Sequence, residues 1–184
     1  LACRPAESEQ SLAFAALGDL LEGVVDDPQL RLPQPQDRAL RVAVLMADPE
    51  DQPPDQRSVS VATLNALRSI SKRAPLLIAI DDLQWMDRAS SRVLDFAVRR
   101  LQSERVGVLT ALRSSDIGTR PILVDSSLSG RLERASLGPL EADAIDALFR
   151  DRLGQSIPRP MLAQVAAASG GNPLFALEIA RGIL

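Results

Sequence analysis

Two adjacent carboxylates, Asp81 and Asp82, directly follow the five apolar residues 76–80. An unbroken apolar run of this length is typical of a parallel strand that is buried on both faces. Open α/β sheets bind their ligands just beyond the carboxyl ends of such strands. Two carboxylates at that position are costly to desolvate without a partner cation. The pair could therefore hold a divalent metal and orient a water molecule, and the alternative is an acidic turn after a core strand.

The composition excludes several kinds of catalytic site. The chain has no histidine, and Cys3 is its only cysteine. Ser-His-Asp and Cys-His triads, an intrachain disulfide and a cysteine-based zinc site are therefore impossible. A hydrolase of some small substrate, acting independently, would have to rely on carboxylates alone, which disfavours that class.

Size and charge limit the cellular setting. With 184 residues, 46% hydrophobic and 24% charged, the chain can form one domain, or one with a small appendage. A net charge of −3 gives no general attraction to nucleic acid. No window is long and apolar enough to cross a membrane, and the first residues do not look like a signal peptide. We expect a cytoplasmic protein that contacts neither a membrane nor, through this chain, DNA.

Strand-like and helix-like segments alternate along the first part of the chain, and the last part is helical throughout. The expected strands are 1–4, 76–80, 106–112 and 132–137. The expected helices are 10–25, 37–47, a third ending near 73 and a fourth capped by hydroxyls of 89–91, with a polar loop and an ambiguous stretch over 114–131 and only helices from 141 onward. This order predicts an α/β fold with a mostly parallel sheet flanked by helices. We expect a core at 1–139 and a small helical subdomain at 140–184.

Five short motifs follow one another in a fixed order. They are Asp81 to Asp87, the helix opening at Ser90, the strand end at 108–113, Leu137-Gly138-Pro139-Leu140 and Gly171-Asn172-Pro173-Leu174. In this order they resemble the ATPase module of the large LuxR-type bacterial transcriptional regulators, which are signal-transducing P-loop ATPases related to AAA+ proteins. The resemblance covers nearly the whole chain and is strongest over 76–113. It implies a P-loop NTPase-like sheet with strand order 5-1-4-3-2 and a helical lid.

The resemblance also implies roles for matching residues, with ATP and Mg²⁺ as cofactors. Asp81 would be the Walker B carboxylate that holds Mg²⁺, and Asp82 the acidic group that positions the hydrolytic water. Arg113 would be the sensor arginine that detects the γ-phosphate, since a guanidinium can engage phosphate oxygens bidentately. Pro173 would lie near the adenine. The alternatives are an ordinary surface arginine at 113 and a plain helix start at Pro173.

Two further residues of the first motif have structural interpretations. Trp85 is expected to be a core anchor under the loop. Asp87 is expected to cap the helix that starts near Ser90, and the alternative is a contact with a neighbouring element.

The chain departs from the family pattern in one respect. A phosphate-binding loop requires Gly-x-x-x-x-Gly-Lys-Ser/Thr, and Lys72, in Ser-Lys-Arg-Ala-Pro, has no glycine near it. The family order places that loop and its strand before Leu1. We therefore expect the first strand and the phosphate-binding loop to be missing from this chain, which would then bind ATP poorly.

The expected function is an ATP-binding regulatory module. In this interpretation the nucleotide state controls oligomerisation and the output of a separate DNA-binding domain, in response to a small-molecule or protein inducer. The complete protein would hydrolyse ATP and this chain would not. The alternative is an inactive ATPase core used for protein–protein contact. Self-association is expected because a missing central strand leaves the strand at 106–112 with an open edge.

Overall fold

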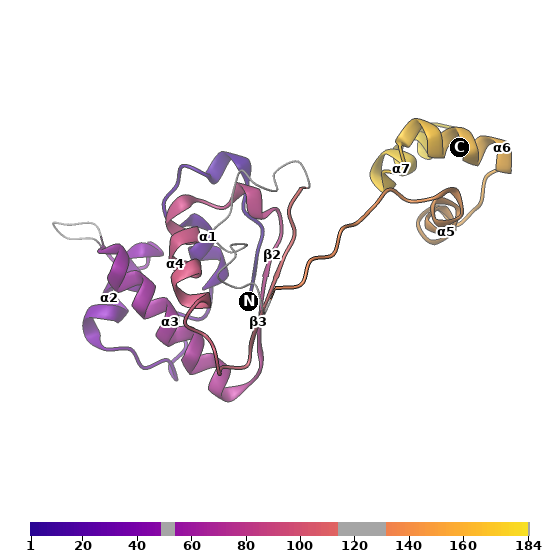
Figure 1. Cartoon of the computed structure of the whole chain (residues 1–184). Coiled ribbons are helices and arrows are strands. Elements are labelled where there is room, and N and C mark those ends of the chain that lie inside the picture. Colours follow the sequence, from indigo (N-terminus) through magenta and orange to yellow (C-terminus); the bar gives the residue numbers. More distant parts are fainter. Residues whose placement is uncertain (49–53, 114–131, 184) are drawn as a thin grey trace. The chain divides into compact units, whose positions relative to one another are not determined.

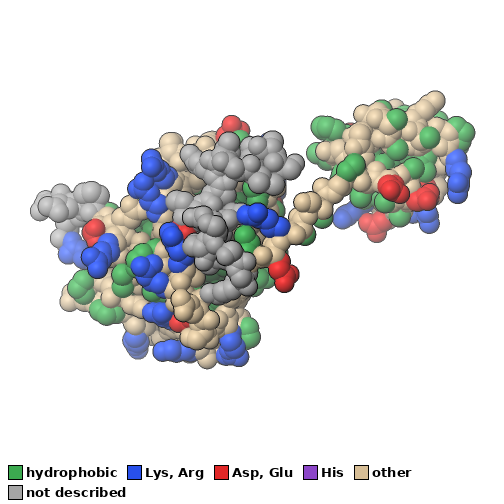
Figure 2. Space-filling model, in the orientation of Figure 1, with side chains coloured by type: hydrophobic (Ala, Val, Ile, Leu, Met, Phe, Trp, Pro, Cys, Tyr) green, Lys and Arg blue, Asp and Glu red, His purple; other side chains and the backbone are tan. Residues whose placement is uncertain are grey.

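The computed structural model describes residues 1–48, 54–113 and 132–183. The expected loop and ambiguous stretch at 114–131 lie outside these residues. The chain divides into two compact units, 1–133 and 134–184, where the sequence predicted a boundary after 139. Figure 1 shows the elements of both units, and each unit is described separately below. Figure 2 shows Lys and Arg side chains in several separate groups on the displayed face of the first unit.

The first unit contains a three-stranded parallel sheet in the order β1-β2-β3. The strands are β1 (Ala2–Cys3), β2 (Leu76–Ile80) and β3 (Val106–Thr110). Cys3 is paired with Ile80, and Ile80 with Thr110, so the carboxyl ends of all three strands lie at one edge. The α/β fold with a parallel sheet and a helical C-terminal region is as predicted.

Helices fill the connections between these strands. Between β1 and β2 lie η1 (Glu7–Glu9), α1 (Ala15–Leu20), α2 (Gln34–Ala43) and α3 (Gln56–Arg73), and between β2 and β3 lie η2 (Leu83–Trp85) and α4 (Arg88–Val98). Helix α3 ends at Arg73 as predicted, because Pro75 favours extended backbone at Ala74. The helix expected over 10–25 is only six residues long, since Phe14 and Gly23 adopt positive φ angles of 64° and 72°.

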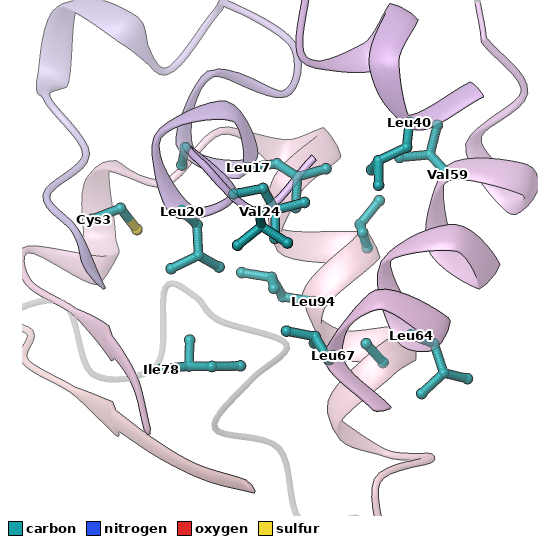
Figure 3. Packing of buried hydrophobic residues seen from close by; sticks show 14 of the residues in the cluster. Cys3, Leu17, Leu20, Val24, Leu40, Val59, Leu64, Leu67, Ile78 and Leu94 are labelled. Carbon is teal, nitrogen blue, oxygen red and sulfur yellow. The ribbon is translucent and has the colours of Figure 1, made fainter. Parts of the chain in front are cut away.

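The core of the first unit lies between the helices and one face of the sheet. Ile78 of β2 points toward apolar residues of α1, α3 and α4, as Figure 3 shows for Leu17, Leu67 and Leu94. These four side chains are almost fully buried. Burial of large aliphatic side chains contributes roughly 1.5–3 kcal/mol each, so this layer fixes the sheet against the helices.

No described helix covers the other face of the sheet, and the expectation that β2 is buried on both faces is wrong. Leu77 and Leu109 are 54% and 62% exposed, so β2 is not buried on both faces. The described helices of this unit lie on one side of the strands in Figure 1. A run of apolar residues indicates that a strand is hydrophobic, but it does not indicate whether other elements cover one face of that strand or both.

The strand expected at 132–137 is also absent. Residues 132–140 form no helix or strand, and Leu137 is 97% exposed. A strand exists only when its backbone groups pair with a neighbour, and among the described residues β3 pairs with β2 alone. The sequence of a segment does not show whether a neighbouring strand is available to pair with it.

The second unit is a small helical bundle of α5 (Ala142–Leu153), α6 (Arg159–Ser169) and α7 (Pro173–Ile183). Its core is formed by Ile145, Phe149, Ile157, Leu162, Val165, Ala176 and Ala180. The turn between α6 and α7 contacts the segment that enters the unit, because the Leu140 amide donates to the Gly171 carbonyl at 2.9 Å. A Cβ on Gly171 would lie 2.5 Å from the Cβ of Pro139, so only glycine fits there. Two of the five sequence motifs are therefore packing partners of each other.

Candidate functional site

The acidic pair lies at the carboxyl end of β2, the middle strand. The Asp81 amide donates to the carbonyl of Cys3 on β1, at 3.1 Å. Asp82 then turns the chain with φ 52° and ψ 47°, a left-handed conformation that is unusual for a residue other than glycine. Its amide donates to Oδ1 of Asp81 at 3.1 Å. The two carboxylates are therefore held beside each other by the backbone at the strand end.

The counter-ion of this pair is Arg4, which the sequence analysis did not identify. The Arg4 guanidinium lies 3.5 Å from Oδ2 of Asp81 and 3.3 Å from Oδ2 of Asp82. Its side chain is 74% exposed, so water screens both ion pairs and each contributes little to stability. The signal was present in the sequence, because Arg4 directly follows β1 and the carboxyl ends of parallel neighbours meet at one edge.

A buried amide holds the other oxygen of Asp82. Nε2 of Gln84 donates to Oδ1 of Asp82 at 2.9 Å. Gln84 is only 8% exposed, and within the described part of the chain its Oε1 has no hydrogen-bond partner. Its own backbone carbonyl accepts a hydrogen bond from Nε2 of Gln10 at 2.7 Å. The loop after β2 is thus anchored both to Asp82 and to the segment that follows β1.

Asp87 is a structural residue that links two helices. Its Oδ1 accepts from the amides of Ser90 at 2.9 Å and Phe14 at 3.0 Å, and its Oδ2 accepts from the amide of Ala16 at 3.2 Å. The predicted cap on α4 is confirmed, and the contact with a neighbouring element, α1, is present as well. The hydroxyl cap expected at 89–91 is wrong, because the Ser90 hydroxyl instead accepts from the Leu17 amide at 2.9 Å.

The end of β3 is joined to the acidic loop. The amide of Ala111 donates to the Ile80 carbonyl, and the amide of Leu83 donates to the Ala111 carbonyl, both at 2.9 Å. Arg113 follows two residues later, with its guanidinium carbon 5.5 Å from the centre of the partly buried Trp85 ring. This is a cation–π distance. The structure brings Arg113 to the same sheet edge as Asp81 and Asp82, where its described contact is with Trp85.

A hollow of about 510 Å³ opens beside Asp81. Ala79, Leu109 and Ala111 provide apolar walls, and Arg4 and Asp81 provide charged groups; Ala2, Cys3 and Ile80 complete the lining. Burial, followed by the negative charges of Asp19 and Asp87, raises the pKa of the Cys3 thiol to about 11. Cys3 is therefore protonated at neutral pH and is not a nucleophile.

Two other residues named in the sequence analysis, Lys72 and Pro173, lie in different units of the chain. Lys72 is in the last turn of α3, which leads into the amino end of β2, so the whole strand separates it from Asp81. Pro173 is the first residue of α7 in the second unit, where the side chain of Asn172 accepts from the amides of Leu174 and Phe175. Pro173 thus occupies a capped helix start.

The described residues were also compared with the requirements of a metal site and of a membrane-spanning helix. In 1–48, 54–113 and 132–183, no three His, Cys, Asp or Glu side chains come together as a metal site. No helix of the described chain is long and apolar enough to cross a membrane.

Comparison with known proteins gives one distant relative. The chain is 29% identical over 126 residues to an uncharacterized protein of Rhizobium meliloti (strain 1021), and the match covers 66% of the chain. The matched part is 12% of that relative, so the relative is a much longer protein. No protein family matches the chain, and no solved structure matches it.

Proposed function

We propose that this chain is part of an ATP-binding regulatory module of the kind found in LuxR-type transcriptional regulators, in a cytoplasmic protein. Asp81 holds the Mg²⁺ that accompanies ATP, and Asp82 orients the attacking water. Arg113 senses the γ-phosphate, and Pro173 contributes to the adenine site. The nucleotide state controls oligomerisation, and a separate domain contacts DNA.

The observation that carries this proposal is the position of the acidic pair. Asp81 and Asp82 stand at the carboxyl end of the middle strand of a parallel sheet, and the neighbouring strand ends near Arg113. Ligands of α/β sheets bind at this edge. The order β1-β2-β3 also agrees with strands 2, 3 and 4 of the order that the resemblance implies.

The described residues fit the metal side of a Mg²⁺–ATP site. Carboxylates are suitable ligands for Mg²⁺, directly or through water, and the Asp81 carboxylate lies at a hollow within the size range of small-molecule sites. When bound, the metal would neutralise phosphate charge. The phosphate side requires a glycine-rich loop, and Lys72 at the other end of β2 does not supply it.

The proposal predicts that ATP affinity requires a phosphate-binding loop that these 184 residues do not supply. A fluorescent ATP analogue titrated with Mg²⁺ should not bind the 184-residue chain, and should bind a longer protein that includes the upstream strand and loop. Asp81→Asn in the longer protein is the matched control and should weaken the Mg²⁺-dependent part of binding. Micromolar affinity of the 184-residue chain itself would contradict the proposal.

A second function is favoured by the open face of the sheet. Leu77 and Leu109 expose apolar surface, and single-sided sheets bury such surface against other protein. An ATPase core without nucleotide chemistry would use this face for protein–protein contact. The upstream gene sequence separates the two functions, because a Gly-x-x-x-x-Gly-Lys-Ser/Thr loop there supports the first, and its absence supports the second.

A further inference from the structure

Gln84 is an unfavourable choice for the stability of the loop that it occupies. Its side chain is 8% exposed, and its Oε1 has no partner among the described atoms. A buried polar group without a hydrogen bond destabilises the fold, because it has lost its bonds to water and gained none in the protein. A methionine or leucine would fill a similar volume without this cost.

The residue that Gln84 contacts is unfavourable as well. Asp82 has φ 52°, a left-handed conformation that is uncommon for residues other than glycine, although aspartate adopts it more often than most. Two unfavourable features thus meet at one hydrogen bond, from Nε2 of Gln84 to Oδ1 of Asp82. Local departures from the most stable sequence are expected where function constrains the residue.

We propose that Gln84 is a positioning residue that fixes the Asp82 carboxylate, so that Oδ2 is the oxygen that accepts a hydrogen bond from the attacking water. This inference rests on the proposed function and adds a residue to it. The side-chain amide of Gln84 must turn its Nε2 toward Asp82, because a carboxylate oxygen only accepts hydrogen bonds. Oε1 of Gln84 is also an acceptor and could not bond to it.

The two oxygens of Asp82 differ in how firmly they are held. Oδ1 has the buried Gln84 as its donor. Oδ2 faces the Arg4 side chain, which is 74% exposed, so water or a ligand can reach this ion pair. Gln84 is itself fixed, since its carbonyl accepts from Gln10 and the preceding Leu83 is buried and bonded to Ala111. The donor to Oδ1 is therefore rigid and the neighbour of Oδ2 is replaceable.

The hydrogen bond can be tested in the 184-residue chain without nucleotide. In ¹⁵N–¹H spectra, Gln84→Met identifies the side-chain amide signals of Gln84 by their loss. These signals should exchange with water more slowly than those of the exposed Gln102, and Asp82→Ala should remove the difference. Equal exchange in the unaltered chain, or no response to Asp82→Ala, would overturn the proposal.

The role in hydrolysis is tested in the full-length protein. Gln84→Met should lower kcat by about 10–100-fold, the usual effect of removing a group that orients a reactive ligand, with little change in the Kd for ATP. Thr63→Val is the matched control, because Thr63 also has a buried unpartnered oxygen but lies in α3. It should leave kcat unchanged.

A double variant separates positioning from general loop damage. In an Asp82→Asn background, Gln84→Met should cause no further loss of kcat, since both act through one group. An additional loss of tenfold or more in the double variant, or an unchanged kcat in the Gln84→Met single variant, would overturn the inference. ATP hydrolysis by the unaltered protein would still support the proposed function in either case. No hydrolysis by the unaltered protein would overturn both, even with the amide signals of Gln84 protected.

Discussion

Replacing Asp87 with alanine should strongly destabilise the first unit. Asp87 is 3% exposed and accepts three backbone hydrogen bonds, from Phe14, Ala16 and Ser90. The donors at Ala16 and Ser90 are buried, so water cannot replace the lost carboxylate there. At about 1–3 kcal/mol for each buried donor left without a partner, the expected loss is about 4 kcal/mol. That is a large part of the roughly 5–15 kcal/mol by which domains are stable.

Asp87→Asn should cost about half as much as Asp87→Ala. The amide oxygen can still accept from Ser90 and Phe14, which share Oδ1. The amide nitrogen would then face the Ala16 amide, where a donor meets a donor. Both variants remove the charge, so the difference between them reports the two hydrogen bonds to the retained oxygen.

Urea unfolding followed by tryptophan fluorescence is the appropriate assay. Trp85 is the only tryptophan and lies in the same loop, so its emission reports the first unit alone. Asp55→Ala is the control, because Asp55 caps the exposed start of α3 only, through Ser58, and should have a smaller effect. A loss below about 1 kcal/mol for Asp87→Ala would fall under the cost of one unsatisfied buried donor and refute the assignment of Asp87 as a shared cap.

Three further outcomes are expected. In the complete protein, Asp82→Asn should suppress ATP hydrolysis more than ATP binding, whereas Asp81→Asn should weaken Mg²⁺-dependent binding too. If Asp82→Asn hydrolysed ATP at an unchanged rate, Asp82 would be an acidic turn residue with no role in hydrolysis. The 184-residue chain should self-associate through the edge of β3 that pairs with no other described strand, and sedimentation showing a monomer at all concentrations would contradict this. The hydrogen bond from Arg73 lowers the pKa of Asp27 below its ordinary 3.8, so the stabilising effect of this ion pair is present above about pH 4 and is lost below it. In Arg73→Gln the urea midpoint should therefore fall less on acidification. The same pH profile in both proteins would show that the pair does not contribute to stability.

The strands of the sheet and the location of its acidic pair were predictable because they depend on local patterns. An apolar run that ends in two carboxylates gives both a strand and its carboxyl edge, and β2 with Asp81 follows that pattern. The start of α7 at Pro173 follows equally local preferences.

The remaining features depend on partners that are distant in the sequence. The bond between Gln84 and Asp82 forms in a loop whose backbone is left-handed at Asp82, and the sequence analysis did not predict that turn. The short α1 depends on the turn at Phe14, whose amide is bonded to Asp87. The exposure of Leu109 and the irregular segment at 132–137 depend on which elements are present to pair or cover them.

The hydrogen bonds of the acidic loop have a consequence for the order of folding events. Gln10 with Gln84, Phe14 with Asp87, and Leu17 with Ser90 are separated by 73 or 74 positions. Closing a loop of that length costs conformational entropy before any contact compensates for it, and non-local contacts of this kind slow folding. We infer that the loop acquires its shape only when the amino-terminal segment docks, late and together with the core. A ribosome-bound chain that ends before residue 90 would contain both carboxylates, but it would lack Ser90 and β3, whose bonds to Leu17 and to β2 hold the surrounding elements in place.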